Sequence, residues 1–567
     1  MSNSGGSRDQ VAALLPWAWS LVLAVVVLGP ALAPGYLLTY DMVWVPDLAL
    51  RPDFVGTGTA LPRAVPSDAV VAVIDEVIPG MLLQKLVLLG SLTAAGAGAA
   101  TLVPGPVLAR LTVSSLVVWN PFVVERLVLG HWPVLLGYAA LPWLVSAGRR
   151  ARTNGPGAAM YLLVPLGSLS AGAGLATALV VLAFGWSGRS RQDAKLLAIL
   201  IAGNAPWLVS GVLHVGDATS DARAAELFAL HGEGHLAAPL AALGLGGIWN
   251  AEVVPTTRTG SLGVVMTLVV VLLAAAGLRR WLRHETGRDR TAQVCLWILG
   301  WGWAVTTWAA PGLTGWLVAH VPGGGLLRDG SRLLVLCLPL FVALSAHGAT
   351  AIRCWIHDRA AALVTAVGLV LVPLALMPDA AWGMSGELGA VEYPDGYEGA
   401  RSAMEDQTSE VGVRGDVVVL PFAAYRAPGW NDGHKVLDPL PRFLDVDYVS
   451  NDELMVDDVV IQGEDPRVPE VQRALGRATP DARARALADL GIGFVVRDGS
   501  GPEAGPAVAG RTVVDDDPVQ VVVLDDVSPR RAPRGWSVAM GLAWAGFCGS
   551  VVFGAVACVV RRRKKRL

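Results

Sequence analysis

Two aspartates near the start of the chain are the first candidates for chemistry. Asp41 and Asp47 lie in the segment YDMVWVPD (40–47), directly after an apolar run that ends near Pro34. A carboxylate held at the end of an apolar helix can take a proton from an incoming hydroxyl group. An aspartate just past a helix end is also commonly a solvated residue, so Asp41 alone does not decide between a catalytic base and a surface group.

A second group of ionisable residues lies between two apolar stretches, in the segment NPFVVERLVLGHW (120–132). Glu125, Arg126 and His131 stand at a depth where charges are costly to bury and are often functional. Arg126 and His131 are five residues apart, which does not place them on one helix face, but a turn between them would bring them together. The structural alternative is that Glu125 and Arg126 pair with other loops and that His131 caps the next helix.

A third segment, PGGGLLRDGSR (322–332), carries Arg328, Asp329 and Arg332. A guanidinium group matches phosphate well, and the start of the following helix would add backbone N–H donors. The glycines permit close approach, but the segment lacks the Gly-Lys-Ser/Thr end of a nucleotide-binding loop. A phosphate site fits this segment as well as the alternatives do, which are a local Arg328–Asp329 ion pair and a contact of Arg332 with lipid headgroups.

Two further clusters occur between residues 216 and 258. The alternate spacing of His231, Glu233 and His235 suits a metal only on a strand, whereas the surrounding sequence indicates helix or loop. The sequence therefore predicts no metal site, and a divalent cation is an option without support. Trp249 and Asn250 can stack on a sugar and hydrogen-bond to it, although tryptophan is equally common at membrane interfaces.

Composition defines the kind of protein that must position these residues. The 567 residues are 53% hydrophobic and only 16% charged, whereas a soluble domain usually carries about 25% charged residues. This composition excludes an ordinary soluble enzyme, a disordered chain and a nucleic-acid-binding protein, and it predicts a polytopic membrane protein. The five cysteines form neither a disulfide framework nor a metal-ligand spacing.

The charge of the loops predicts the topology. A membrane-crossing helix needs roughly 20 apolar residues, and short cytoplasmic loops collect Lys and Arg. The apolar stretch 157–186 lies between two basic clusters, so it must cross an even number of times and is predicted to be two short helices joined near 168–174, with one long tilted helix as the alternative. About twelve spans result, with both termini cytoplasmic. The spans are expected near 11–34, 80–103, 106–120, 132–148, 157–186 (two), 195–215, 260–280, 292–312, 332–350, 360–377 and 536–560.

The same topology places four loops outside the cytoplasm, 35–79, 120–131, 216–258 and 313–331, which carry the candidate residues except Arg332, the first residue of the next span. Residues 379–533 hold 29 acidic and 14 basic side chains, whereas the rest of the chain holds 18 acidic and 30 basic ones. This asymmetry predicts an acidic domain attached to a body with basic loops.

Short patterns indicate the fold of the acidic domain. The runs 415–422, 492–498 and 519–526 are typical of strands, and Pro480–Leu490 is typical of a helix. We therefore expect a mainly α multispanning body (1–378), a small extracytoplasmic α/β domain (379–533), and a final span with a basic tail (534–567). The aromatic-rich segment 420–443 fits either a glycan-facing surface or a surface packed against the body.

Together these segments resemble the GT-C superfamily of integral membrane glycosyltransferases, particularly multispanning actinobacterial members. The resemblance rests on the acidic first external loop with Asp41, the external domain before the last helix, and three motifs. The motifs are NPFVVERLVLGHW (120–132), GIWN (247–250) and LRDGSR (327–332). It covers most of the chain.

The resemblance implies transfer of a sugar from a polyprenyl-phosphate carrier to an acceptor on the outer face of the plasma membrane. In actinobacteria the sugar is arabinofuranose or mannose, and the acceptor is an envelope polysaccharide or glycolipid. Asp41 corresponds best to the family's acidic residue; several members have an adjacent Asp-Asp pair, whereas here Asp47 follows six residues later. The remaining implied roles are donor-phosphate binding by Arg126, His131, Arg328 and Arg332, and acceptor or sugar binding by Glu125, Trp249, Asn250 and Asp329.

Two other classes remain open. A non-catalytic envelope scaffold of the same fold would bind a glycan or a protein through its external domain. A flippase for lipid-linked sugars would suit the span count, but the halves of the sequence show no symmetry and the spans show no acidic relay. The sequence predicts no nucleic-acid partner and names no protein partner.

Overall fold

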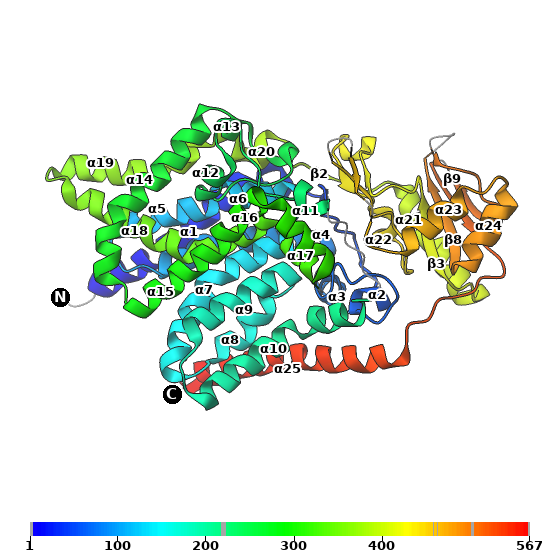
Figure 1. Ribbon diagram of the computed structural model, residues 1–567, viewed down its shortest axis with the longest axis horizontal. Coiled ribbons are helices and arrows are strands. Elements are labelled where there is room, and N and C mark those ends of the chain that lie inside the picture. The colour runs from blue at the N-terminus through cyan, green and yellow to red at the C-terminus, as the bar shows by residue number, and fades with distance from the viewer. Residues whose placement is uncertain are drawn as a thin grey trace.

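The computed structural model of the protein describes residues 4–216, 223–321, 323–456, 459–461, 463–499, 504–516 and 518–564. Residues 217–222 of the third predicted external loop and 565–567 of the basic tail lie outside this description. A helical body forms one part of the molecule and a domain that contains the strands forms the other (Figure 1). Both ends of the chain lie at the end of the body away from the strands (Figure 1).

The body consists of long helices joined by loops with short helical turns. Its main helices are α1 (Ser4–Leu28), α4 (Gly80–Thr101), α5 (Val107–Val118), α6 (Pro121–Val128), α7 (Trp132–Asn154), α8 (Ala158–Leu166), α9 (Ala171–Gly185), α10 (Ser190–Leu213), α14 (Ser261–His284), α15 (Gly287–Trp297), α16 (Trp303–Ala309), α17 (Pro311–His320), α18 (Leu338–Trp355), α19 (Arg359–Leu376) and α25 (Arg534–Lys564). The loops hold α2 (Pro52–Val55), α3 (Ser67–Ile74), α11 (Ala224–Leu227), α12 (Ala238–Leu243), α13 (Thr256–Thr259) and the 3₁₀ helix η5 (Gly330–Cys337).

Within the described residues, eight helical segments are long and apolar enough to cross a membrane. They are Gln10–Leu32, Gly80–Thr101, Val107–Val128, Ser190–Leu213, Ser261–His284, Gly330–Trp355, Arg359–Leu376 and Arg534–Arg561. The expected count of about twelve is not confirmed. Some predicted spans are shorter helices, such as α8 and α9, and the one near 292–312 contains a π-helical turn (Ile298–Gly302) between α15 and α16.

The stretch 157–186 forms two helices, α8 and α9, which confirms that prediction, although the break lies at 167–170. Gly137 of α7 faces Ala173 of α9, and Gly148 faces Phe184, so α7 and α9 run parallel. Helix α8 therefore runs back toward the end of the body where α7 begins, and α9 then runs in the same direction as α7. The absent side chains of the two glycines allow this close approach.

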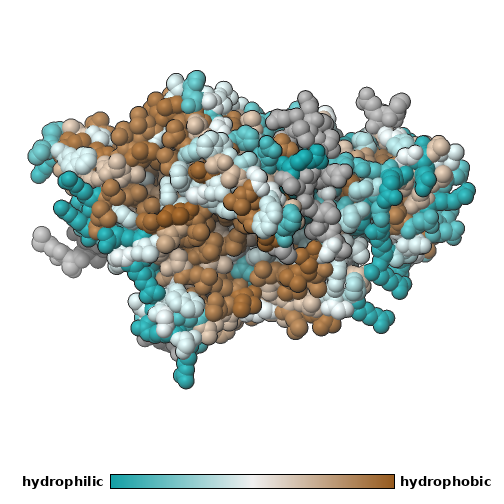
Figure 2. Space-filling view, viewed as in Figure 1, coloured by the Kyte–Doolittle hydropathy of each residue, from teal (hydrophilic) through white to brown (hydrophobic). Residues whose placement is uncertain are grey.

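The surface of the two parts differs as their compositions require. Apolar side chains cover much of the helical body, whereas polar side chains cover most of the strand-containing domain (Figure 2). Exposed apolar residues on α1, α14, α19 and α25 belong to the candidate spans. Such a surface is stable in contact with lipid and not with water, so the protein is embedded in a membrane.

The sheet domain, named here for residues 390–523, has a four-stranded sheet in the order β3-β8-β10-β9. Its strands are β3 (Asp416–Leu420), β8 (Ile492–Asp498), β9 (Arg511–Asp516) and β10 (Val519–Val523). Only β3 and β8 are parallel. Helices α23 (Arg467–Leu475) and α24 (Pro480–Asp489) connect β3 to β8 and cover one face, and α21 (Asp395–Asp406) contacts β9 and β10.

The three predicted strands and the predicted helix are therefore confirmed. Side chains alternate between the two faces, with Val418 and Leu420 packed on α23 and α24 and Val417 and Val419 in the main core. Burial on both faces explains why these strands are almost continuously apolar. The strand β9 was not predicted because four of the six residues in its sequence, RTVVDD, are polar.

The first loop of the body is joined to the sheet domain by backbone pairing. Strand β1 (Tyr36–Leu37) pairs with β2 (Ala390–Val391), and Tyr40 accepts from Leu437 and donates to Lys435 (both 2.8 Å). Leu437 belongs to β5 (Val436–Leu437), which pairs with β4 (Tyr425–Arg426). The loop that contains Asp41 thus lies between the body and the sheet domain.

Arg51 is a buried connection between these two parts. Its guanidinium donates to the carbonyls of Pro441 (3.1 Å) and Leu444 (3.0 Å), and it lies 4.2 Å from the centre of the Phe54 ring. Leucine at this position would leave those buried carbonyls without their donor.

We expect Arg51→Leu to lower the stability of the protein by about 2 kcal/mol or more. Thermal unfolding in detergent measures the change. Limited proteolysis should cut the variant, more readily than the wild type, in the segments where the first loop contacts the sheet domain. Arg473→Leu removes the same charge at an exposed position and serves as the control. Equal Tm values for the two variants would contradict the assigned role of Arg51.

Candidate active site

Helix α6 and the turn after it position two of the predicted residues, Arg126 and His131. The helix begins at Asn120, whose side-chain oxygen accepts a hydrogen bond from the Val123 N–H (3.1 Å). It ends at a turn in which Gly130 has φ +80°, a conformation that favours glycine. The His131 N–H donates to the Arg126 carbonyl (2.9 Å) across this turn. The turn brings the two side chains together as the sequence suggested.

The first loop approaches the same turn and brings Asp41 to it. A β-carbon at Gly130 would lie only 2.2 Å from the Met42 nitrogen, so this approach requires glycine. The Asp41 N–H donates to the Leu129 carbonyl (3.2 Å). The backbone therefore fixes Asp41 beside His131.

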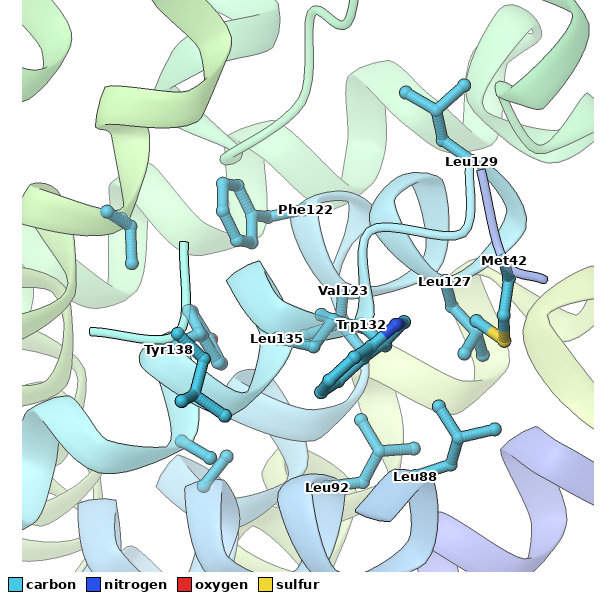
Figure 3. Packing of buried hydrophobic residues seen from close by; sticks show 14 of the residues in the cluster. Met42, Leu88, Leu92, Phe122, Val123, Leu127, Leu129, Trp132, Leu135 and Tyr138 are labelled. Carbon is cyan, nitrogen blue, oxygen red and sulfur yellow. The ribbon is translucent and has the colours of Figure 1, made fainter. Parts of the chain in front are cut away.

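Apolar packing below the turn supports this arrangement. Figure 3 shows the Trp132 ring facing Leu88 and Leu92, which belong to α4. Met42 of the first loop and Leu127 of α6 lie beside them (Figure 3). All five side chains are buried, so the polar residues above rest on a close-packed apolar base.

The polar side chains form a continuous chain of contacts. Asp41 Oδ2 lies 3.1 Å from His131 Nε2, and His131 Nδ1 lies 3.1 Å from Arg126 Nη1. Arg126 donates to both oxygens of Asp329 (3.0 and 3.3 Å) and also to the Ser331 hydroxyl. Four predicted site residues from the first, second and fourth loops thus meet at one place.

Asp329 joins this chain to Arg332. It accepts from the Arg332 backbone N–H (3.3 Å) and from its Nε (2.9 Å). Burial would raise the pKa of the Asp329 carboxyl, but Arg126 and Arg332 hold it well below its usual range. The Arg332 side chain is 37% exposed, and its two terminal NH₂ groups hydrogen-bond to no residue that the structure describes. Arg332 therefore has donors to offer a ligand.

The contacts of His131 define which of its ring nitrogens carries the hydrogen. An arginine can only donate hydrogen bonds, so His131 Nδ1 must accept from Arg126, and Nε2 must carry the hydrogen that reaches Asp41. Burial lowers the pKa of His131 to about 4, with help from Arg332 and Arg126 and against the hydrogen bond to Asp41. His131 is therefore neutral near pH 7.

Asp41 is held as a carboxylate. Desolvation in this crowded site would raise its pKa, but the hydrogen bonds from His131 and Tyr425 and the charge of Arg332 lower it below its usual value. The side chain is nevertheless 40% exposed. An ionised carboxylate is thus fixed in orientation and open to an incoming molecule.

Tyr425 is a site residue that the sequence analysis did not identify. Its hydroxyl donates to Asp41 Oδ1, and its ring meets Tyr40 edge-on at 6.2 Å. Tyr425 belongs to the aromatic-rich segment noted above, but no pattern in one sequence relates it to a residue 384 positions away. The sheet domain thus supplies a side chain to the site.

Five predicted residues lie outside this chain of contacts, and two of them pair with the sheet domain. Asp47 is 55% exposed and pairs with Arg401 of α21 (2.8 Å). Arg328 forms an ion pair with Glu464 of the sheet domain, and its guanidinium lies 4.7 Å from the centre of the Phe228 ring. The pairing of Arg328 with Asp329 that the sequence allowed does not occur, because Asp329 is engaged by Arg126 and Arg332.

Glu125 belongs to a separate buried cluster. Arg258 and Glu233 form a fully buried ion pair (2.5 Å), and Glu125 lies close enough to interact with both. This engagement of Glu233 argues against a metal at His231, Glu233 and His235. Among the described residues, no group of three or more His, Cys, Asp or Glu could hold a metal ion.

Trp249 and Asn250 border the site and have structural contacts. The Trp249 ring meets Phe228 edge-on at 4.6 Å. The Asn250 side chain accepts from the Glu252 N–H (3.0 Å), and Glu252 in turn accepts from the Tyr40 hydroxyl (2.5 Å). Through Tyr40 this loop lies next to Asp41, although neither predicted side chain contacts that carboxylate among the described contacts.

A narrow apolar crevice adjoins Arg332. It lies between α7, α9 and η5, where glycine and alanine leave room beside larger apolar side chains. Its other lining residues are Val134, Gly137, Tyr138, Gly172, Ala173, Ala176 and Val335. The crevice has a volume of about 10 Å³, the space of one water-sized sphere, so an apolar chain with its negatively charged end at Arg332 enters it only if α7 and α9 move apart.

Comparison with known proteins adds nothing to this geometry: the chain matches no protein-family model, and searches of curated proteins and of solved structures find no similar protein.

The lowered pKa of His131 predicts how stability depends on pH. Its folded pKa of about 4 lies below the ordinary value of 6.5. As the pH falls through this window, the unfolded chain takes up a proton that the folded protein excludes, so stability decreases. We expect wild-type Tm to fall between pH 6.5 and 4 more steeply than that of His131→Gln. Parallel Tm profiles for the two proteins would contradict a neutral buried His131.

Proposed function

We propose that the protein is an inverting glycosyltransferase of the GT-C type. It moves a sugar, arabinofuranose or mannose, from a polyprenyl-phosphate carrier to an envelope polysaccharide or glycolipid. The reaction takes place at the outer face of the plasma membrane of an actinobacterium, with both termini in the cytoplasm. This proposal combines the sequence resemblance with the chemistry that the site residues can perform.

One observation carries the proposal: an ionised, partly exposed carboxylate and a guanidinium with free donors belong to one network beside an apolar crevice. Asp41 supplies the carboxylate, Arg332 the guanidinium, and the chain through His131, Arg126 and Asp329 joins them. A lipid-linked phosphosugar has matching parts: an apolar chain, a phosphate and a sugar carbon that can be attacked.

In the proposed reaction Asp41 removes the proton from the acceptor hydroxyl. The acceptor oxygen then forms a bond to the anomeric carbon, and the bond between that carbon and the phosphate oxygen breaks. The electron pair leaves with the polyprenyl phosphate, whose growing negative charge Arg332 stabilises. Direct displacement inverts the anomeric configuration. The Tyr425 hydroxyl on Asp41 marks a position where an acceptor hydroxyl would fit.

The network assigns different roles to the two arginines of the site. Arg126 is almost fully buried and is engaged by Asp329, Ser331 and His131, so it is a positioning residue and does not bind the donor directly. His131 likewise orients Asp41. Of these two arginines, Arg332 is the one with donors that a phosphate can reach.

A non-catalytic envelope scaffold is the second candidate. The observation in its favour is that Arg126 and Arg328 both already have carboxylate partners, Asp329 and Glu464. In a scaffold these pairs would be structural, and substitution of Asp41 would leave function intact.

The first test replaces the proposed base. Asp41→Asn should reduce sugar transfer by roughly 10²- to 10⁴-fold, because the amide cannot accept the proton. Transfer is measured with purified protein and either decaprenyl-phosphate arabinofuranose or polyprenyl-phosphate mannose as the donor. Asp47→Asn is the matched control, since Asp47 lies in the same loop but pairs with Arg401.

Size-exclusion profiles and Tm values establish that both variants fold. Full transfer activity in Asp41→Asn, with a donor that the wild type uses, would eliminate Asp41 as the base. Failure of the wild type to transfer from either donor would favour the scaffold.

A further inference from the structure

Glu464 of the sheet domain bridges two arginines from separate loops of the body. One carboxylate oxygen pairs with Arg328 of the fourth loop, and the other lies 3.7 Å from Nη2 of Arg63 in the first loop. Arg328 and Glu464 are each 26% exposed and Arg63 is 50% exposed. The pair is therefore neither buried nor freely solvated.

The surrounding residues hold both partners in place. The Phe228 ring lies under the Arg328 guanidinium at 4.7 Å. The Glu464 backbone N–H donates to Asp452 Oδ2 (2.7 Å), and Asp452 also pairs with Arg63. The bridge is thus a defined arrangement of two cations and two carboxylates, in which Arg63 contacts both Asp452 and Glu464 and Arg328 contacts Glu464.

Arg332 adds a third guanidinium nearby. Burial lowers the pKa of Arg328, Glu464 opposes this, and the positive charges of Arg332 and Arg63 lower the pKa further. Arg328 and Arg63 of the fourth and first loops therefore share one anion of the sheet domain, Glu464, and the charge of Arg332, which lines the crevice, reaches Arg328.

We propose that Glu464 occupies the place of a phosphate group and that a lipid-linked phosphate displaces it from Arg328 and Arg63. A phosphate presents its oxygens to guanidinium groups much as a carboxylate does, and it adds charge and acceptors. Because the Arg328–Glu464 pair is partly exposed, breaking it lowers the stability of the protein only slightly. This inference rests on the proposed function: donor binding exchanges a contact between the sheet domain and the body for a contact with substrate.

The exchange also explains why Arg328 is already paired. An unpaired arginine beside a membrane attracts lipid headgroups and free anions. An internal carboxylate neutralises it and gives way only to a ligand that has further contacts, such as an apolar chain in the crevice beside Arg332. The occupied arginine is thus compatible with a binding site.

The experiment measures the affinity of decaprenyl phosphate for the full-length protein in phosphatidylcholine nanodiscs. Glu464→Gln should bind it more tightly than the wild type by roughly 3- to 10-fold, because the competing charge is gone. Arg328→Gln should bind it more weakly, and the double variant should match Arg328→Gln. Glu470→Gln is the control, since it removes the same charge from an exposed pair with Arg530 (2.6 Å) in the same domain.

Two further probes, phosphatidylglycerol and inorganic phosphate, distinguish the sources of the phosphate. Tighter binding of decaprenyl phosphate alone in Glu464→Gln supports the proposal. An equal gain in affinity for phosphatidylglycerol or inorganic phosphate would show that the arginines bind anions in general, and this result would overturn the proposal.

The remaining outcomes separate this inference from the proposed function. If the wild type binds decaprenyl phosphate and Glu464→Gln binds it no more tightly, only the role of Glu464 is wrong. If neither protein binds decaprenyl phosphate, both proposals are wrong.

Discussion

The ion pair between Arg126 and Asp329 is the interaction on which the candidate site depends. Both side chains are almost completely buried, and two hydrogen bonds of 3.0 and 3.3 Å join them. Removal of either partner would leave a buried charge without compensation, which is strongly destabilising. Because the partners come from the second and fourth loops, the pair fixes these loops against each other. His131 is oriented by one partner and Arg332 by the other, so the positions of Asp41 and of the free guanidinium donors both follow from it.

The sheet domain is part of this arrangement and not an independent appendage. It pairs with the first loop through β1 and β2, receives the guanidinium of Arg51, and places Tyr425 on Asp41. A mainly helical body with one added domain can thus build a site from elements far apart in sequence. The proposed displacement of Glu464 uses the same junction, since it exchanges one contact between domain and body for a contact with the lipid-linked donor.

Local patterns predicted the elements better than their contacts. The strands β3, β8 and β10 and the helix α24 were predictable because buried strands and capped helices have short-range signatures. The convergence of Arg126 and His131 could also be predicted, because Gly130 allows a turn between them.

The contacts of Asp41 with Tyr425 and of Arg328 with Glu464 were not predictable, because no periodicity relates loops 384 or 136 residues apart. For the same reason Asp47, which matches Asp41 in residue type and loop, could not be separated from it before its pairing with Arg401 was known. The predicted count of about twelve spans is not confirmed, since eight helical segments of the described residues are long and apolar enough to cross a membrane.

A structure of the protein with decaprenyl phosphate in lipid nanodiscs, determined by electron cryo-microscopy, tests the account most directly. The account predicts the phosphate within hydrogen-bond distance of Arg332 and Arg328, with the prenyl chain in an opened crevice between α7 and α9 and Asp41 facing the side where an acceptor enters. A crevice that stays closed, with the phosphate bound elsewhere and Asp41 unchanged on Tyr425 and His131, would contradict it.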